Sequence, residues 1–247
     1  MTDPEYPVRT THTSFRVIEA VERCGGLGVT ALAEEIGVSK SAAHKHLTTL
    51  ARLGYLDRDG DTFRLGIGFF RLGSTARRGL PLYRAGRDVA DELAEATRGT
   101  VRLLAENGDY GIYVYHAHGA SPPGVDVEAG ERVPLHSTPG GKAILSFLPD
   151  DRLGRLVRRI ELQQMTTNTR TDRDALEHEL ESIRNRRLAF EQGTRRTGWR
   201  SVAAPVVADD YPVGSVVVLA DADDDRTDRE AVPDRLREAA AEIERLL

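Results

Sequence analysis

The segment from Thr30 to Gly54, TALAEEIGVSKSAAHKHLTTLARLG, constrains the fold more than any other part of the chain. Its first part predicts a short helix capped by Thr30, and Gly37 suits the positive φ of a tight turn. Ser39 is placed to cap a second helix. The apolar spacing of that helix predicts one buried face, formed by Ala43, Leu47, Leu50 and Leu53. Two helices joined in this way indicate a helix-turn-helix, which makes DNA binding the leading function class.

A β-hairpin is predicted directly after the second helix. The residues from Tyr55 to Leu65 alternate in polarity around a turn that contains Gly60. A hairpin in this place is typical of the wing of a winged helix-turn-helix. We therefore expect a winged helix-turn-helix domain over residues 13–67.

The start of the chain is expected to contribute a further helix to this domain. Ser14 is predicted to cap a helix over residues 15–24, which two glycines end. Residues 1–12 are polar and are expected to form a disordered tail. The helix completes the three-helix core that such a domain needs.

The outward face of the second helix carries neutral and positively charged side chains. The N-terminal residues of such a helix reach base edges in a major groove. Lys45 is expected to reach a guanine edge, and Lys40 to contact phosphate. The two hairpin arginines are expected to touch the DNA backbone or the adjacent minor groove. The candidate DNA-binding residues are Ser39, Lys40, Ser41, His44, Lys45, Thr48, Arg58 and Arg64.

The charge is distributed unevenly. The whole chain carries a net charge of −5. Residues 1–79 hold 11 lysines and arginines against 9 aspartates and glutamates, a net of +2, while the remainder holds 23 against 30, a net of −7. A basic module attached to an acidic body fits a protein whose first part meets phosphate.

Length and composition exclude several classes of protein. At 247 residues the chain has room for two domains with a core each. No apolar stretch of about 18 residues is present, which excludes a transmembrane helix. The N-terminus lacks the apolar region of a secretory signal. The single cysteine, Cys24, excludes an internal disulfide framework and a cysteine-based zinc cluster. A cytoplasmic location without membrane association is expected.

The remaining sequence predicts a linker helix over residues 68–80 and an α+β domain over residues 81–247. A break at Gly79-Leu80-Pro81 precedes its first helix. The pattern indicates an open sheet covered by helices. Its strands are expected over 101–106, 110–116, 132–135, 201–207 and 213–220, and its later helices over 139–148, 172–187 and 234–247.

A helix start at Ser137-Thr138-Pro139-Gly140-Gly141-Lys142 is a candidate binding site. Thr138 is placed as its cap, and Pro139 is preorganised for the first helical position. Glycines leave the N–H groups of such a terminus accessible to a carboxylate or phosphate. An ordinary capped helix remains the alternative interpretation.

An enzyme is the main competing interpretation. His116 and His118 form an H-x-H pair on a predicted strand, and Glu128 or His136 would be a third metal ligand. No H-E-x-x-H motif or cysteine pair supports them, and Ser201 lacks the G-x-S-x-G context of a nucleophile. We therefore expect no catalytic residues, no metal and no cofactor.

With these motifs in place, the chain resembles the IclR family of transcription regulators over about residues 14–246. The match rests on several motifs in the right order, and no single one would suffice. They include Gly37-Val38-Ser39-Lys40-Ser41, His44-Lys45-His46-Leu47, Leu53-Gly54-Tyr55-Leu56, Arg64-Leu65-Gly66, Leu135-His136-Ser137-Thr138, Gly141-Lys142-Ala143-Ile144-Leu145 and Gly198-Trp199-Arg200-Ser201-Val202-Ala203-Ala204-Pro205-Val206.

The resemblance implies an α+β protein in which a linker helix joins the winged helix-turn-helix to a GAF/profilin-like α/β effector domain. It also implies a homodimer or homotetramer that binds a (pseudo)palindromic double-stranded operator. Such a protein regulates the transcription of a metabolic operon under the control of a small organic-acid or sugar-derived effector. The alternative is a small-molecule sensor whose winged helix binds protein, which predicts partner binding that salt changes little.

The resemblance also assigns an effector site around the predicted helix start. Ser201 stands where the family commonly has cysteine, and its hydroxyl is able to donate and accept hydrogen bonds. Trp199 offers an aromatic face for stacking, and Glu191 is expected to accept from a ligand hydroxyl. These features favour a hydroxylated organic acid as effector. The candidate effector-binding residues are Thr138, Pro139, Gly140, Glu191, Trp199 and Ser201.

Overall fold

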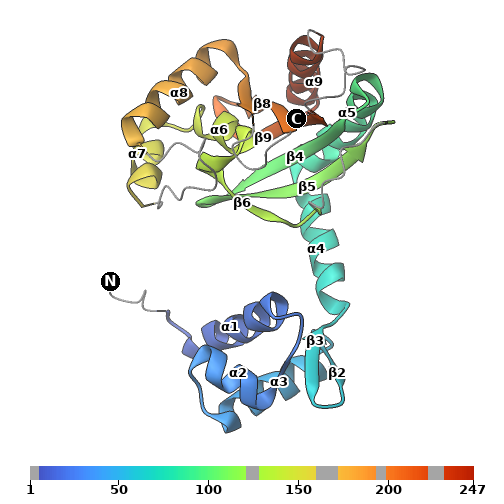
Figure 1. Cartoon of the computed structure of the whole chain (residues 1–247), viewed down its shortest axis with the longest axis vertical. Helices are drawn as coiled ribbons and strands as arrows, with labels where there is room; N and C mark the ends of the chain where they lie inside the picture. The colour runs from blue at the N-terminus through green and yellow to red at the C-terminus, as the bar shows by residue number, and fades with distance from the viewer. Residues whose placement is uncertain (1–5, 121–127, 160–171, 193–198, 222–230) are drawn as a thin grey trace. The chain divides into compact units, whose positions relative to one another are not determined.

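The computed structural model describes residues 6–120, 128–159, 172–192, 199–221 and 231–247 (Figure 1). The chain forms two compact units, Met1–Ala76 and Arg77–Leu247. We describe each unit by itself. None of the described helices is long and apolar enough to cross a membrane.

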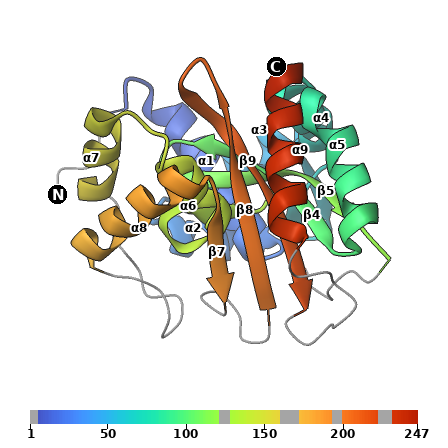
Figure 2. The same ribbon diagram turned by 90° about the horizontal axis from the view of Figure 1, so that it is seen from above.

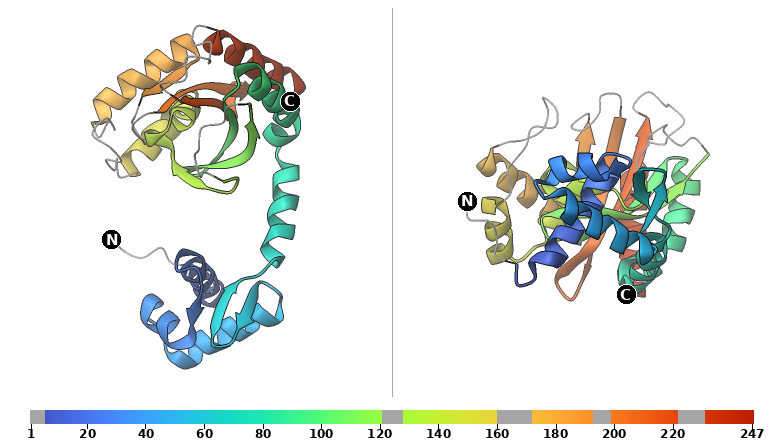
Figure 3. Two further views of the ribbon diagram at one scale, coloured as in Figure 1. Left: turned by 45° about the vertical axis from the view of Figure 1, so that its right-hand side comes forward. Right: turned by 90° about the horizontal axis from the view of Figure 1, so that it is seen from below.

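The first unit is a winged helix-turn-helix, as predicted. Its hairpin and a short third strand form an antiparallel sheet in the order β1-β3-β2, and the hairpin is visible beside the three helices in the left view of Figure 3. Apolar residues of all three helices, together with Leu56 and Phe63 of the hairpin, form one core. The elements are α1 (Arg9–Arg23), β1 (Leu27–Gly28), α2 (Val29–Ile36), α3 (Lys40–Arg52), β2 (Leu56–Asp59) and β3 (Thr62–Leu65).

The turn between α2 and α3 follows the sequence prediction closely. Gly37 adopts a φ of 67°, in the left-handed region that glycine occupies at little cost. Ala43, Leu47 and Leu50 are buried. Leu53, predicted to lie on the same face, is exposed because α3 ends at Arg52 and the chain turns away there.

The first helix begins earlier than predicted. It starts at Arg9, inside the segment expected to be a disordered tail, and Ser14 is an interior residue rather than a cap. The Ser14 hydroxyl donates to the carbonyl of Thr10 at 3.1 Å, and Thr13 bonds back to Arg9 in the same way at 3.0 Å. Hydroxyls bonded four residues back belong to a helix interior. The predicted cap at Ser14 is therefore wrong.

The predicted cap at Thr30 is also wrong. Leu27 and Gly28 form the edge strand β1, which pairs with Phe63 and Thr62 of β3. The chain passes directly from that strand into α2, so that Gly28 occupies the N-cap position without a side-chain hydrogen bond. A two-residue strand carries no alternation to detect, which is why the sequence did not indicate it.

The second unit is an α+β domain built on a six-stranded antiparallel sheet in the order β6-β5-β4-β9-β8-β7. The α+β fold class is confirmed, but α7 and β7 were not predicted. The helices are α4 (Gly68–Gly79, which spans the boundary between the units), α5 (Pro81–Thr97), a 3-10 turn η1 (Leu135–Ser137), α6 (Pro139–Leu145), α7 (Asp150–Arg159), α8 (Arg173–Arg186) and α9 (Val232–Leu246). The strands are β4 (Thr100–Asn107), β5 (Tyr110–His118), β6 (Arg132–Pro134), β7 (Ala189–Gln192), β8 (Trp199–Ala208) and β9 (Tyr211–Asp221).

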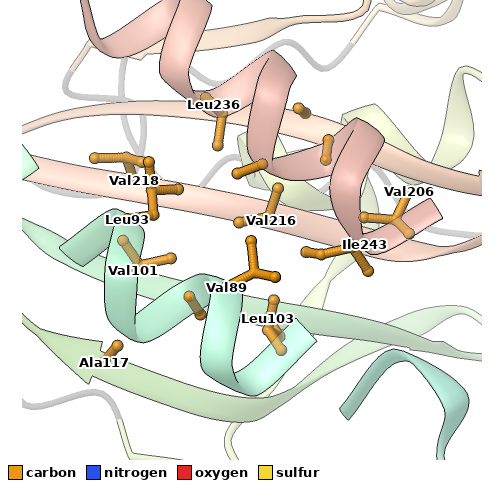
Figure 4. Packing of buried hydrophobic residues seen from close by; sticks show 14 of the residues in the cluster. Val89, Leu93, Val101, Leu103, Ala117, Val206, Val216, Val218, Leu236 and Ile243 are labelled. Atoms are coloured by element: carbon orange, nitrogen blue, oxygen red, sulfur yellow. The ribbon is translucent and has the colours of Figure 1, made fainter. Parts of the chain in front are cut away.

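The two faces of this sheet pack against different helices. One face, with Val101, Leu103 and Val216, packs under α5 and α9, which lie side by side in Figure 2 and enclose the cluster shown in Figure 4. The other face, with Leu104 and Val217, packs against α6, α7 and α8. We refer to this second side of the sheet as the α6 face.

A β-bulge changes which residues of β5 point to the α6 face. Leu103 of β4 pairs with Tyr115 of β5, whereas the next residue, Leu104, pairs with Tyr113. Val114 of β5 is therefore the extra residue of the bulge. Tyr113 and His116 are three residues apart but both lie on the α6 face, and their rings pack edge-to-face at 5.6 Å. Strict alternation would have placed these two side chains on opposite sides.

Candidate DNA interface and effector site

The outward face of α3 carries the residues predicted to meet DNA. Lys40, Ser41, His44 and Lys45 are exposed, and Thr48 is half-buried. Helix α3 contains no acidic residue. The face is therefore neutral or positive along its whole length, as contact with phosphate requires.

Ser39 begins this helix as the sequence predicted. Its hydroxyl accepts a hydrogen bond from the backbone N–H of Ala42 at 3.2 Å. The remaining N–H groups of the first turn and the helix dipole favour an anion there. His46 is half-buried and hydrogen-bonded through Nδ1 to the Ser14 hydroxyl at 2.9 Å. This bond joins α3 to α1.

The two hairpin arginines have structural contacts besides their predicted role. Arg58 donates from Nε to the carbonyl of Gly60 at 2.8 Å, and its guanidinium lies 5.6 Å from the centroid of the Phe63 ring. Arg64 donates from Nη1 to the carbonyl of Gly25 at 3.0 Å. Both side chains remain exposed. They brace the wing, and their charge is partly cancelled by the exposed aspartates of the hairpin, among them Asp61, which lies 3.8 Å from Arg58.

The predicted helix start of the second unit is present and tightly packed. The Thr138 hydroxyl accepts from the N–H of Gly141 at 3.0 Å, and Pro139 is the first helical residue. A Cβ added at Gly140 would lie 2.8 Å from Val217 Cγ2 and 2.9 Å from the Ser215 hydroxyl oxygen. The N-terminus of α6 therefore packs directly against strand β9. The helix ends at Leu145, three residues before the predicted end at 148.

Two basic side chains, of which the sequence singled out only His116, lie side by side on the α6 face. Arg102 of β4 and His116 of β5 are cross-strand partners. Arg102 is buried, and its guanidinium lies 5.3 Å from the centroid of the Tyr113 ring. Burial is the largest cause that lowers the pKa of His116 to about 4, followed by the positive charge of Arg102 and then His118. His116 is therefore neutral at pH 7.

Of the other candidate effector residues, Ser201 lies on the α6 face. It is buried, paired in register with Leu219 of β9, and two residues from Ala203, which packs on that face. The backbone of Glu191 in β7 pairs with Ser201, and Trp199 is the first residue of β8. The side chains of Glu191 and Trp199 lie outside the described residues.

The histidine pair considered as metal ligands lies on one face of β5, since His116 and His118 pair with Arg102 and Thr100 in one register. His118 shares a hydrogen bond through Nδ1 with the Thr100 hydroxyl at 3.3 Å. Glu128 is exposed, whereas His136 is buried in η1. Within the described residues, no group of three histidine, cysteine, aspartate or glutamate side chains is arranged to hold a metal ion.

Comparison with known proteins decides between the regulator and the enzyme. Residues 14–60 match the IclR helix-turn-helix domain, and residues 75–245 match the bacterial transcriptional regulator IclR C-terminal domain. The chain belongs to the IclR family. IclR-family proteins regulate transcription and are not enzymes, so the winged helix is a DNA-binding domain and the second unit is an IclR effector domain.

Individual IclR-family proteins support this assignment over most of the chain. The probable HTH-type transcriptional regulator ArcR of Halobacterium salinarum is 30% identical over 78% of this chain and 75% of its own length. The crystal structure of Thermotoga maritima IclR is 29% identical, has a TM-score of 0.75, and aligns over 96% of this chain and 98% of its own. An IclR homolog from Microbacterium hydrocarbonoxydans, complexed with 4-hydroxybenzoate, shares the fold at 19% identity, with a TM-score of 0.81 over 96% and 98% of the two chains.

Proposed function

We propose that this IclR-family protein controls a metabolic operon by binding its operator through α3. The observation that carries the proposal is the exposed face of α3, where Lys40 and Lys45 stand on a helix without acidic residues. The overall charge of the chain is negative. Operator contact through this helix would therefore place the basic part of an acidic protein on the phosphates.

The proposed control is a small hydroxylated organic acid bound in the second unit. Support comes from the N-terminus of α6, which packs against Val217 and Ser215 of β9, and from the buried side chain of Ser201 on the same side of the sheet. The Microbacterium homolog was complexed with 4-hydroxybenzoate, which is itself a hydroxylated acid. Such a ligand would act in the cytoplasm by changing how the DNA-binding domains engage the operator.

The proposed function is tested first by a gel shift of the full-length protein on the DNA upstream of its own gene. Scrambled DNA of the same composition is the control, and both are titrated across a salt series. We expect specific retardation that weakens steeply with salt, by about 0.9 in log K per log unit of salt for each phosphate neutralised. Equal binding to both DNAs, or no binding by folded protein, would favour a winged helix that recognises protein.

Two lysine substitutions separate base contact from phosphate contact on α3. Lys45→Ala is expected to cost roughly 1–3 kcal/mol and to relax specificity at one base pair, whereas Lys40→Ala should weaken all sequences alike and reduce the salt slope by about 1. Arg84→Ala removes an exposed arginine from α5 and serves as the matched control. Unchanged operator affinity in the Lys45 variant would show that Lys45 does not read a base.

We further propose that the protein binds its operator as a homodimer, or as a tetramer built from dimers. Helix α4 buries none of its residues within the chain. Ile67, just before α4, is 80% exposed, Phe70 on it is 67% exposed, and Phe15 of α1 is 57% exposed. A contiguous patch of exposed apolar side chains is typical of a surface that packs against another protein, and Ile67 and Phe70 lie three residues apart at the start of α4. A two-fold dimer would present two recognition helices to a palindromic site.

The oligomer is tested by light scattering after size exclusion of the full-length protein. Phe70→Glu is expected to lower the molar mass toward that of one chain, and Arg71→Glu, a neighbouring exposed residue, is the control. A wild-type protein that is monomeric at micromolar concentration would contradict the proposal.

A further inference from the structure

The first helix of the DNA-binding domain contacts both helices of the helix-turn-helix through polar side chains. Its buried stripe packs into the apolar core of the first unit. Helical periodicity places Ser14 on one flank of that stripe and Arg16 on the other. Arg16 donates from Nη2 to the carbonyl of Ile36, the last residue of α2, at 2.7 Å. On the opposite flank, Ser14 is bonded to His46 of α3.

The bond between Ser14 and His46 has a defined direction. The Ser14 hydroxyl has one proton, which it donates to the carbonyl of Thr10 at 3.1 Å. The same oxygen is then an acceptor for His46 Nδ1, 2.9 Å away. Both bonds form together only when Nδ1 carries a proton. His46 is therefore the donor, and the bond persists whether the imidazole is neutral or charged.

Among the residues that the structure describes, this is the one side-chain hydrogen bond between α3 and another helix. The other contacts that hold α3 against the core are apolar and come from Ala43, Leu47 and Leu50. Hydrophobic packing is non-directional, whereas a hydrogen bond weakens when its distance or angle changes. The bond therefore restricts the rotation of α3 about its axis more tightly than the packing does.

A small rotation of α3 would change its contact with DNA. His46 directly follows Lys45, so a rotation that breaks the bond moves Lys45 by the same angle. Side chains at the surface of a helix lie about 5–6 Å from its axis, so a rotation of about 10° moves them by about 1 Å. That is enough to stretch a bond of 2.9 Å beyond its range. It also exceeds the roughly 0.5 Å within which a binding residue must be held.

We propose that Ser14 and His46 are positioning residues for sequence recognition, which fix the rotation of α3 so that its outward side chains meet the correct base edges. This inference rests on the proposed operator contact through α3 and adds the pair that aligns that helix. Contacts with phosphate position a protein without reading sequence, whereas a bidentate contact with a base edge requires a fixed geometry. Loss of the pair should therefore lower sequence preference more than overall affinity for DNA.

The test measures a specificity ratio on the full-length protein, defined as the Kd for scrambled DNA divided by the Kd for the upstream DNA. Ser14→Ala and His46→Leu each remove the bond, and His46→Asn keeps an N–H donor near the position of Nδ1. Arg23→Gln is the matched control in the same unit, because it removes an exposed ion pair with Glu35 that joins α1 to α2 and does not involve α3. Thermal melts show which variants are folded.

We expect Ser14→Ala and His46→Leu to lower the specificity ratio about fivefold, the factor that corresponds to the net free energy of one typical hydrogen bond. The double variant should lower it no further, because both changes remove the same bond. His46→Asn and Arg23→Gln should keep the wild-type ratio. In a Lys45→Ala background, Ser14→Ala should change the ratio less, since one base contact that depends on the alignment is already missing.

A bond that serves only the stability of the fold would give a different result. Ser14→Ala and His46→Leu would then lower the melting temperature and weaken binding to both DNAs alike, and the unchanged ratio would overturn the proposal. A loss in His46→Asn or Arg23→Gln as large as that in His46→Leu would overturn it too. Either result, in a wild type that prefers the upstream DNA, leaves the proposed regulator intact. A wild type without preference would reject operator recognition through α3, and the positioning role with it.

Discussion

The N-cap of the recognition helix allows stability and DNA binding to be separated at one residue. The Ser39 hydroxyl accepts from the N–H of Ala42 at 3.2 Å and is exposed. Ser39→Ala removes that bond and should lower the free energy of unfolding by about 1 kcal/mol. Ser39→Asp keeps an acceptor in the same place and suits the positive end of the helix dipole, so its stability should match the wild type.

For operator affinity the order of the two variants should be reversed, with Ser39→Asp weaker than Ser39→Ala. A carboxylate added about 4 Å from a phosphate is repelled by about 1 kcal/mol in water and by about 4 kcal/mol at an effective dielectric of 20. Ser39→Asp should therefore weaken operator binding by roughly fivefold to several hundredfold. Because salt screens exposed charges, this added repulsion should shrink as salt rises. Ser39→Ala should bind nearly as well as the wild type.

Urea unfolding followed by circular dichroism measures the change in the free energy of unfolding. Fluorescence anisotropy on the operator at two salt concentrations measures the change in operator affinity. Asp172 caps α8 in the same manner, accepting from the N–H of Ala175 at 2.8 Å. Asp172→Ala is therefore the control, which should lose a similar stability without changing operator affinity. Wild-type affinity in Ser39→Asp would refute the placement of the α3 N-terminus against a phosphate.

Three further predictions concern the second unit and the helix before it. Gly140→Ala should cost about 1–3 kcal/mol of stability, because the added Cβ would overlap the sheet below it, while Gly73→Ala, with open space around it, should be neutral or stabilising in the same thermal melt. Lys142→Met should cost roughly 3 kcal/mol in urea unfolding, because it removes the buried ion pair in which Lys142 Nζ lies 3.0 Å from Glu179, and adding Glu179→Leu should recover much of the loss. The free energy of unfolding should fall as the pH drops from 6.5 to about 4, since the pKa of His116 is lower in the folded chain than in the unfolded one; His116→Gln should reduce this slope in denaturation curves measured across that range.

The sequence was sufficient to predict the elements that depend on local signals. The spacing of Ala43, Leu47 and Leu50 and the cap at Ser39 specify α3, and the structure agrees with both. The cap at Thr138 was likewise visible, because hydroxyl caps act within three residues of their own position. Family motifs then supplied the order of the two units.

Features that depend on pairing between distant segments were not predicted. The strand at Leu27 exists because β3 lies beside it, and the start of α1 at Arg9 shows no local capping signal. The placement of Arg102 depends on which face of β4 is covered by α6, and the position of Tyr113 depends on a bulge. None of these is encoded by a local period, so they required the structure.

The few lysines of this chain have a practical consequence for following its contact with DNA. The sequence contains three, of which Lys142 is buried against Glu179, while Lys40 and Lys45 stand exposed on α3. Among the lysines of the folded protein, an amine-reactive reagent would therefore modify only those of the recognition helix. Chemical footprinting by mass spectrometry would then detect operator binding, without any engineered label, as protection of Lys40 and Lys45 from modification. Modification of Lys142 would indicate that the protein had unfolded.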